Sequence, residues 1–281
     1  MINKIKKYIF LVVILVVVVV LGFYLGVKLS KYNGRTLDDK VVAFRIGIRE
    51  KLVDYDLKAM LSYLKCKYEK DGYEVREFAY AGDLYPKRLD NAGVNLFVRG
   101  DFVPFDKRVN EKAHNIYFVQ RFVGGYIEEF RNFDEYLSIQ EPLIVAAKAN
   151  GVEVGYLEGG SCKNHNLTTK DAKNIIYIYE EKNINVIDIV SKIKNIKIYS
   201  TIDFAELEEK EKIAELEKAK VVVFDRDLQR FPDKKYVPYA VYELIGYGKK
   251  VITNSHNGTK LPDGALRFSD VNEMIYLMEK Y

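Results

Sequence analysis

From Lys40 onward, short apolar runs alternate along the chain with segments whose apolar residues recur every three or four positions. In the helical segment 55–69, Leu57, Met60 and Leu61 follow this spacing, and Gly72 is placed to end the helix. The strands predicted in this half are 41–46, 74–80, 94–98, 115–119 and 135–139. Strands separated by helices predict a parallel sheet that is covered on both faces.

A second series of the same kind follows the break at Gly159-Gly160-Ser161. It predicts strands at 174–179, 196–199, 221–224 and 250–253, and helices at 185–193, 204–218, 238–246 and 271–280. We therefore expect an α/β fold of two Rossmann-like, doubly wound domains, 40–160 and 161–281. In such folds ligands bind at the carboxyl ends of the strands, so two facing domains predict a cleft between them. The charged pairs Glu206/Lys210 and Glu208/Lys212 predict a solvent-exposed face on helix 204–218.

The first forty residues predict a membrane anchor. A basic N-terminus, 1–7, precedes an uncharged run of roughly 20 residues, 8–27, which as a helix is about 30 Å long and matches the bilayer core. The alternative is a cleaved signal peptide, but the run is too long for one and ends without a small-residue cleavage site. Residues 28–39 are expected to form a polar tether. Lysines and arginines flank the run on both sides, so charge does not set its orientation.

Composition excludes several classes of protein. The chain has 281 residues, of which 48% are hydrophobic, and its net charge is only +4, which argues against a disordered protein. No long block of lysine and arginine is present, so nucleic acid is not expected as a partner. Cys66 and Cys162 stand far apart in no metal-binding spacing. We expect them to be reduced and interpret them as residues of a reducing compartment.

Strong catalytic signatures are absent from the sequence. It has no G-x-S-x-G elbow, Walker A loop, HExxH or G-x-G-x-x-G after the first strand. The histidines His114, His165 and His256 are far apart and are interpreted as surface or loop residues. No metal site is expected.

The segment 236–258 has the clearest chemical pattern. Pro238 suits the first turn of a helix, Glu243 follows in the second turn, and Gly246 and Gly248 end the helix before the next strand. A helix N-terminus at a cleft offers N–H groups and a positive dipole end to an anion. A carboxylate one turn further can accept hydrogen bonds from a ribose diol.

The pattern P-x-x-x-x-E-x-x-x-x-G-x-x-V-I-T in this segment resembles the donor-binding domain of GT-B glycosyltransferases. The resemblance is greatest to group 1 enzymes (the GT4-like class and the related spore-maturation CgeB-type domain). It implies that Glu243 binds the ribose of a nucleotide sugar and that the helix N-terminus at Pro238 and Tyr239 faces the diphosphate. It also implies metal-independent transfer with no cofactor besides the donor substrate. Segment 157–160 is similar to the hinge strand of the family.

Two departures from the family pattern stand out. Lys235 occupies the place of a second glutamate that contacts the donor sugar, and Glu180-Glu181 occupy a loop that usually offers a cation. The cations that could replace it, through charge-assisted hydrogen bonds to phosphate, are Arg226, Arg230 and Lys234. In the first domain, Asp101 and Arg121 follow predicted strands and are the candidate catalytic groups on the acceptor side.

The resulting prediction is a membrane-anchored glycosyltransferase that moves a sugar from a nucleotide-diphosphate donor to a carbohydrate or lipid-linked acceptor. Because nucleotide sugars are cytosolic, its domains are expected on the cytoplasmic side of a single-pass anchor. One alternative is a degenerate domain that binds glycans or a protein without catalysis. Another is an extracytoplasmic ligand-binding protein held by a signal anchor.

Overall fold

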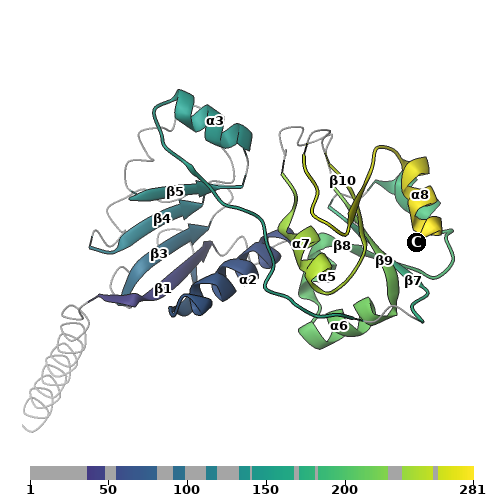
Figure 1. Ribbon diagram of the computed structural model, residues 1–281, viewed down its shortest axis with the longest axis horizontal. Helices are drawn as coiled ribbons and strands as arrows, with labels where there is room; N and C mark the ends of the chain where they lie inside the picture. The colour runs from purple at the N-terminus through teal and green to yellow at the C-terminus, as the bar shows by residue number, and fades with distance from the viewer. Residues whose placement is uncertain are drawn as a thin grey trace, which may run out of the picture.

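In a computed structural model of the chain, two parallel sheets lie side by side and the chain crosses from one to the other (Figure 1). The structure describes residues 37–47, 55–80, 91–98, 112–118, 133–139, 141–167, 171–180, 183–226, 236–255 and 259–281. The first sheet has the order β2-β1-β3-β4-β5-β6. Its strands are β1 (Asp38–Gly47), β2 (Glu74–Tyr80), β3 (Ala92–Val98), β4 (His114–Phe118), β5 (Glu135–Ser138) and β6 (Gly155–Tyr156).

The second sheet has the order β11-β10-β9-β7-β8 and is also parallel throughout. Its strands are β7 (Asn174–Tyr179), β8 (Ile196–Ser200), β9 (Ala219–Asp225), β10 (Val251–Asn254) and β11 (Ala265–Phe268). In both sheets the first strand of the domain lies between the second and the third. The strand order therefore reverses between β1 and β3 and between β7 and β9, where open α/β sheets bind ligands.

Helices cover both faces of the second sheet. On one face, α5 (Thr201–Glu206), α6 (Glu209–Lys218) and α7 (Tyr239–Gly246) enclose a core that includes Ile176, Val222 and Leu244. On the other, α4 (Ile184–Val190) and α8 (Val271–Lys280) enclose a second core. The side chains of Asn183 and Asp270 accept backbone hydrogen bonds at the starts of α4 and α8, which fixes where these helices begin.

The first sheet has α2 (Tyr55–Lys70) on one face and α3 (Glu141–Ala149) on the other. Helix α2 also packs against α7 and α5 of the second domain. The core beneath α2 includes Tyr236 and Tyr239 from the second domain, and Tyr55 of α2 is part of the core of the second domain. The two domains thus exchange aromatic residues and form one body around α2 and α7.

The residues between the sheets run along α7. The backbone N–H of His165 donates to the carbonyl of Gly246 at 2.8 Å, and a Cβ added at Gly246 would lie 2.6 Å from the carbonyl oxygen of Lys163. A side chain at position 246 would therefore push this connection, 157–167, away from the helix. No strand is present at 157–160, where the hinge strand was expected. The last strand of the first sheet, β6, ends at Tyr156.

Cys66 and Cys162 form a disulfide with a Cα–Cα distance of 6.2 Å, which ties α2 to the connection 157–167. The expectation of reduced, unpaired cysteines is therefore wrong. The 96 positions that separate them gave no indication of their proximity, because it depends on how the two domains pack. Disulfides persist in oxidising compartments, so the cysteines no longer support a reducing one.

The helix predicted at 204–218 is interrupted. Helix α5 ends at Glu206 and α6 begins at Glu209, so the pairs Glu206/Lys210 and Glu208/Lys212 do not lie along one helix face. Lys212 is only 7% exposed, and its ammonium lies 4.9 Å from the centre of the Tyr55 ring. The expected solvent-exposed face is therefore wrong at Lys212, which covers the aromatic residue that α2 inserts.

None of the helices in the described part of the chain is long and apolar enough to cross a membrane. The apolar run 8–27 lies outside the described residues, together with the basic N-terminus 1–7 and most of the tether 28–39.

Candidate functional site

A cavity of about 270 Å³ lies between the two domains. The first domain supplies residues at and just after the carboxyl ends of β5 and β6, and the second supplies the residues that lead into α7, its first turn and the segment after β10. The lining residues are Ile139, Glu141, Tyr156, Leu157, Gly159, Tyr236, Val237, Tyr239, Tyr242, Thr259 and Lys260. The cavity thus lies at the carboxyl ends of both sheets, where the sequence predicted a cleft.

The N-terminus of α7 borders this cavity and is capped by a residue of the first domain. The carboxylate of Asp56, in the first turn of α2, accepts a hydrogen bond from the backbone N–H of Ala240 at 3.1 Å. Pro238 is the N-cap of α7 and provides no side-chain cap. The positive end of the helix dipole, predicted to face a diphosphate, therefore already holds a negative group.

Tyr239 and Tyr242 face the cavity, and Tyr239 also holds the connection 157–167 in place. Its hydroxyl donates to the carbonyl of Glu158 at 3.0 Å. Burial raises the pKa of Tyr239, with a further increase from the neighbouring Tyr63 and Asp56. The phenol is therefore neutral and acts as a hydrogen-bond donor.

Glu243 lies on the opposite side of α7. It is 6% exposed and does not line the cavity. Its position three residues after Ala240 and four before Tyr247 turns it toward the core between α7, α6 and α2. There Tyr247 donates to the carboxylate of Glu209 at 2.5 Å, and Lys163 pairs with the same carboxylate at 2.6 Å.

Burial is the largest influence on the pKa values of the charged side chains between α7, α6 and α2. It raises the pKa of Glu243, an effect that Lys212 and Lys163 partly offset. Burial lowers the pKa of Lys212, because it disfavours the charged form, while the negative charges of Glu243 and Glu209 act in the opposite direction. Burial alone would raise the pKa of Glu209, but its hydrogen bonds with Lys163 and Tyr247 hold it below the usual value. The expected contact of Glu243 with a ribose stays a prediction.

The carboxyl ends of β7, β9 and β10 are joined by a polar network. Asn254 donates to Asp225 at 2.9 Å and accepts from the backbone N–H of Arg226 at 2.8 Å, and Tyr177 donates to Asp225. The guanidinium of Arg226 is buried, donates to the carbonyl of Tyr236 at 2.9 Å and lies over its ring. Arg226 thus supports the segment that leads into α7.

Four predicted site residues, Asp101, Arg121, Arg230 and Lys234, lie outside the described residues. The structure therefore brings together only Pro238, Tyr239, Arg226 and Glu243, and of these Pro238, Tyr239 and Arg226 lie near the cavity. Among the described residues no group of three or more acidic, histidine or cysteine side chains could hold a metal ion.

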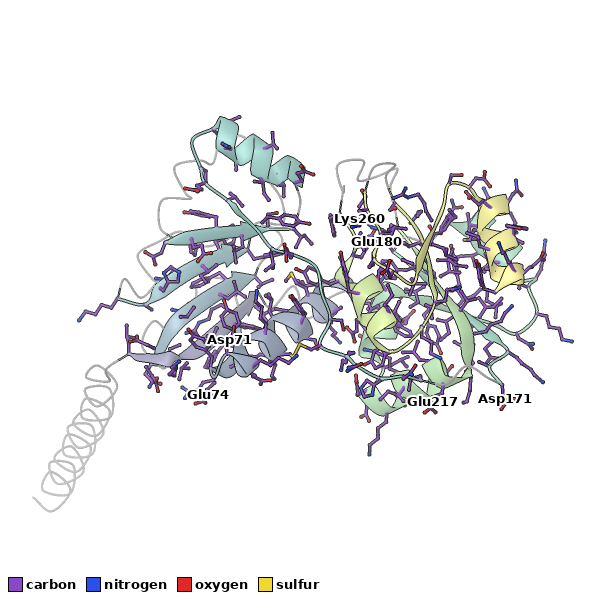
Figure 2. All side chains as sticks on the ribbon, in the orientation of Figure 1. Asp71, Glu74, Asp171, Glu180, Glu217 and Lys260 are labelled. Carbon is purple, nitrogen blue, oxygen red and sulfur yellow. A yellow bond between two sulfur atoms is a disulfide. The ribbon has the colours of Figure 1, made fainter. Side chains whose placement is uncertain are left out.

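The sequence reasoning missed Glu141 and Lys260. Glu141 begins α3 just after β5, and Lys260 follows β10, the strand that the motif at 236–258 leads into. Figure 2 shows Lys260 on the side of the second domain that faces the first. A search for charged residues just after each predicted strand would have found Glu141, whereas Lys260 lies six residues beyond the end of β10 and has no such signal.

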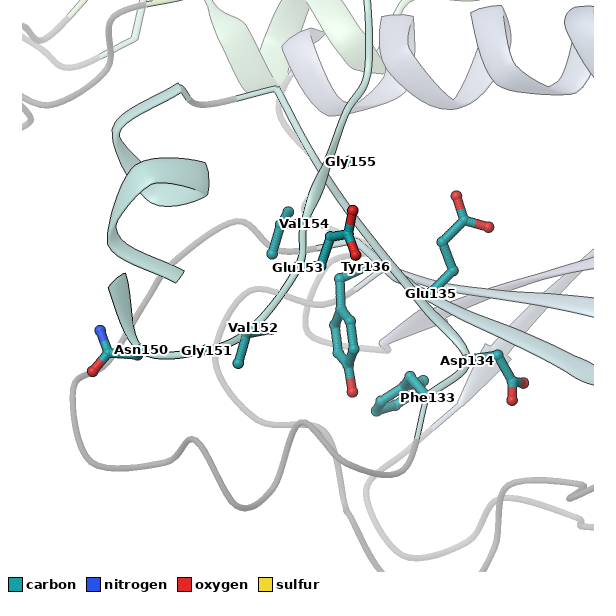
Figure 3. Close-up of a pocket in the computed structure, with 10 residues that line it drawn as sticks. All are labelled: Phe133, Asp134, Glu135, Tyr136, Asn150, Gly151, Val152, Glu153, Val154 and Gly155. Atoms are coloured by element: carbon teal, nitrogen blue, oxygen red, sulfur yellow. The ribbon is translucent and has the colours of Figure 1, made fainter. Parts of the chain in front are cut away.

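A larger hollow of about 650 Å³ lies between the segment 133–136 and the turn 150–155 (Figure 3). Asp134, Glu135 and Glu153 make it acidic. It borders the starts of β5 and β6, the amino ends of the first sheet, whereas ligands of parallel sheets bind at the carboxyl ends. We therefore place the candidate site in the cavity between the domains.

Comparison with known proteins supports the fold. No protein-family model and no curated protein sequence matches the chain. Three solved structures of an alpha-glucosyltransferase are similar. One, in complex with UDP and a 13-mer DNA containing a central A:G mismatch, has a TM-score of 0.55 at 12% identity, over 85% of this chain and 88% of that one. A second, with UDP and a 13-mer DNA containing an HMU base, has a TM-score of 0.54 at 10% identity, over 77% and 80%. A third, with UDP, has a TM-score of 0.50 at 11% identity, over 76% and 80%.

These structures correct one expectation from the sequence. The absence of a long block of lysine and arginine was taken to argue against nucleic acid as a partner, yet two of the three similar structures hold DNA together with UDP. The absence of such a block therefore does not decide this question. At 10–12% identity the similarity concerns the fold alone. The chain has the two-domain α/β fold of these UDP-bound alpha-glucosyltransferases.

Proposed function

We propose that the chain is a glycosyltransferase that moves a sugar from a nucleotide-diphosphate donor within the cavity between its two domains. The observation that carries this proposal is the place of the cavity, at the carboxyl ends of both sheets and beside the N-terminus of α7. Similar structures with this fold hold UDP, which supports a nucleotide donor.

The transfer breaks the bond between the anomeric carbon and the diphosphate oxygen, which keeps the electron pair. A bond forms between that carbon and an acceptor oxygen, and the proton of that hydroxyl passes to the leaving diphosphate or to water. Most of the catalysis would come from fixed dipoles and charges that stabilise the leaving diphosphate. We propose Pro238 and Tyr239 for the diphosphate side, with Arg230 and Lys234 as supporting cations. From the motif we also propose Glu243 for the ribose and Arg226 as a further cation, but both side chains are buried, and Glu243 lies across α7 from the cavity, so these two contacts require the side chains to turn toward the ligand.

On the acceptor side we propose Asp101 and Arg121, with no metal and no cofactor. The proposed acceptor is a glycan or a lipid-linked saccharide, as in the group 1 and CgeB-type enzymes that the motif at 236–258 resembles. The apolar run 8–27 would hold the enzyme at a membrane where such acceptors are found. Duplex DNA is the other acceptor to be tested, because DNA is present in two of the similar structures.

The direct test is thermal unfolding of the full chain in detergent with UDP, GDP, ADP and CDP. A nucleotide at 100 times its dissociation constant should stabilise the chain by about 2.7 kcal/mol. Glu243→Gln, which keeps the shape of the side chain, should reduce this gain if Glu243 contacts the ribose. Transfer of labelled sugar to polyprenyl-linked saccharide or to duplex DNA then identifies the acceptor. If none of the four nucleotides stabilises the chain, the proposal is contradicted.

A second candidate is a binding module without catalysis on the outer side of the membrane. The disulfide Cys66–Cys162 favours it, because disulfides persist in oxidising compartments. The placement of Asp56 at the N-terminus of α7 favours it too. This candidate predicts that the folded chain binds no nucleotide.

Localisation separates the two candidates. Transfer from a cytosolic nucleotide sugar requires the domains on the cytoplasmic side, which stays a prediction. Added protease would then leave the domains intact in whole cells and digest them after lysis. Digestion in whole cells would favour the binding module.

A further inference from the structure

Among the described residues that line the cavity between the domains, one side chain is positive and one is negative. Lys260 is the positive one, from the second domain, and Glu141 is the negative one, from the first. The other lining residues are neutral, and four of them are tyrosines. A phosphorylated ligand in this cavity therefore has one cationic side chain available among the described lining residues.

The two described arginines of the second domain, Arg226 and Arg267, are engaged in holding the structure. Arg226 donates to the carbonyl of Tyr236. Arg267 donates to the hydroxyl of Ser255 at 2.8 Å and to the carbonyl of Thr259. The latter bond fixes the backbone just before Lys260 against β11, so the root of the lysine side chain is held at the wall of the cavity.

The cap on α7 increases the need for a cation. The carboxylate of Asp56 accepts the hydrogen bond of the Ala240 N–H, and its charge opposes a second anion at this helix end. A diphosphate beside α7 thus meets a dipole that is already partly neutralised. A lysine on the facing segment can offset this by a charge-assisted hydrogen bond to phosphate oxygen.

We propose that Lys260 binds the phosphate groups of the donor. This inference rests on the proposed function and assigns its phosphate contact to the segment after β10. The ammonium of Lys260 holds the diphosphate in the ground state and stabilises its added negative charge as the bond to the sugar breaks.

The test compares Lys260→Gln and Lys260→Arg with the parent chain. Binding of UDP, UMP and uridine is measured by calorimetry on the full chain in detergent, with GDP, ADP and CDP and their nucleosides run in parallel. Lys260→Gln should weaken the diphosphate about 10- to 100-fold and leave the nucleoside unchanged, whereas Lys260→Arg should retain most of the affinity. Lys280→Gln is the matched control, because Lys280 lies in the last turn of α8, away from the cavity.

The possible outcomes distinguish the role of Lys260 from the proposed function. Equal diphosphate affinity in Lys260→Gln and the parent chain would overturn the role of Lys260 and leave the proposed function standing. So would an equal loss in Lys280→Gln, which would indicate an effect of net charge. Failure of the parent chain to bind any nucleotide would overturn both proposals. Equal losses of diphosphate and nucleoside would show a distorted cavity rather than a phosphate contact, and would also overturn the role of Lys260.

Discussion

The two sides of α7 carry very different chemistry. Toward the core, Glu243 and Tyr247 lie among Glu209, Lys212 and Lys163, and these charges are paired with one another or oppose one another at close range. Toward the cavity, Tyr239 and Tyr242 present aromatic walls. One side of α7 thus joins the two domains, and the other side can face a ligand.

This difference separates stability from binding. Substitutions on the core side should weaken the fold, and those at the cavity should change ligand binding with little effect on folding. The residue that the motif emphasised, Glu243, belongs to the first group by burial, and the lysine at the cavity belongs to the second. The following experiments would break or sharpen this division.

Removal of Tyr55 should have the largest effect. Its ring is fully buried in the second domain, and its centre lies 4.8 Å from that of Phe204. Tyr55→Ala should lower the free energy of unfolding by about 3–5 kcal/mol, measured in urea. Tyr55→Phe is the control. The hydroxyl of Tyr55 is buried without a hydrogen-bond partner, so its removal should cost less than about 1 kcal/mol. Equal losses in the two variants would show that the hydroxyl, not the ring, joins the domains.

Loss of the disulfide should come next. Cys66→Ser with Cys162→Ser should lower stability by about 2–4 kcal/mol, because the bond closes a long loop in the unfolded chain. Dithiothreitol should lower the urea midpoint of the parent chain and leave that of the double variant unchanged. A parent chain that is fully reduced, as shown by mass spectrometry, yet unchanged in stability would contradict this expectation.

On the cavity side, Tyr239→Phe should have a smaller effect. It removes the hydrogen bond to the carbonyl of Glu158, which is worth about 1 kcal/mol. Urea unfolding measures the loss, and nucleotide calorimetry shows whether the phenol also contacts a ligand. A loss above about 3 kcal/mol would place Tyr239 with the core side of the helix.

The pH dependence should show the smallest effects, with opposite signs for two carboxylates. Burial raises the pKa of Glu243, so its contribution to stability is full below the unfolded value of about 4.5 and is lost as the pH rises through the folded pKa. The pKa of Glu209 is lowered, so its contribution is present above about 4.5 and is lost as the pH falls through the folded value.

Urea unfolding from pH 3 to 8 measures how the free energy of unfolding changes with pH on each side of about 4.5. Glu243→Gln should flatten the decline in stability above about pH 4.5, and Glu209→Gln should flatten the loss below it. The same slope in Glu243→Gln as in the parent chain would mean that Glu243 is ionised throughout and is solvated in the folded protein.

Much of the fold followed from periodicity, because strands and helices with a clear apolar pattern keep their local preference. The predicted bounds of β2, β7 and α8 agree with the structure. The break at Leu207 was not predicted, because charged residues on both sides of it continue a helical pattern. Helix α3 and strand β11 were missed, and the boundary near 160 did not reveal that α2 packs into the second domain.

The site was less predictable than the fold. The motif located the N-terminus of α7, since Pro238 and the glycines define the helix locally. The cap by Asp56, the burial of Glu243 and the disulfide depend on contacts between residues far apart in the chain, which periodicity does not encode. Lys260 was missed because a single lysine in a short segment has no pattern.

The disulfide also gives the chain an unusual topology. Residues 66–162 form a covalent ring that holds five of the six strands of the first sheet, whereas β1, the strand between β2 and β3, comes from outside it. If the oxidised protein is pulled by its two ends, β1 can be drawn out while the ring stays closed. Its extension under force should therefore fall short of that of the reduced chain by about 330 Å, the stretched length of the 96-residue separation at roughly 3.5 Å per residue.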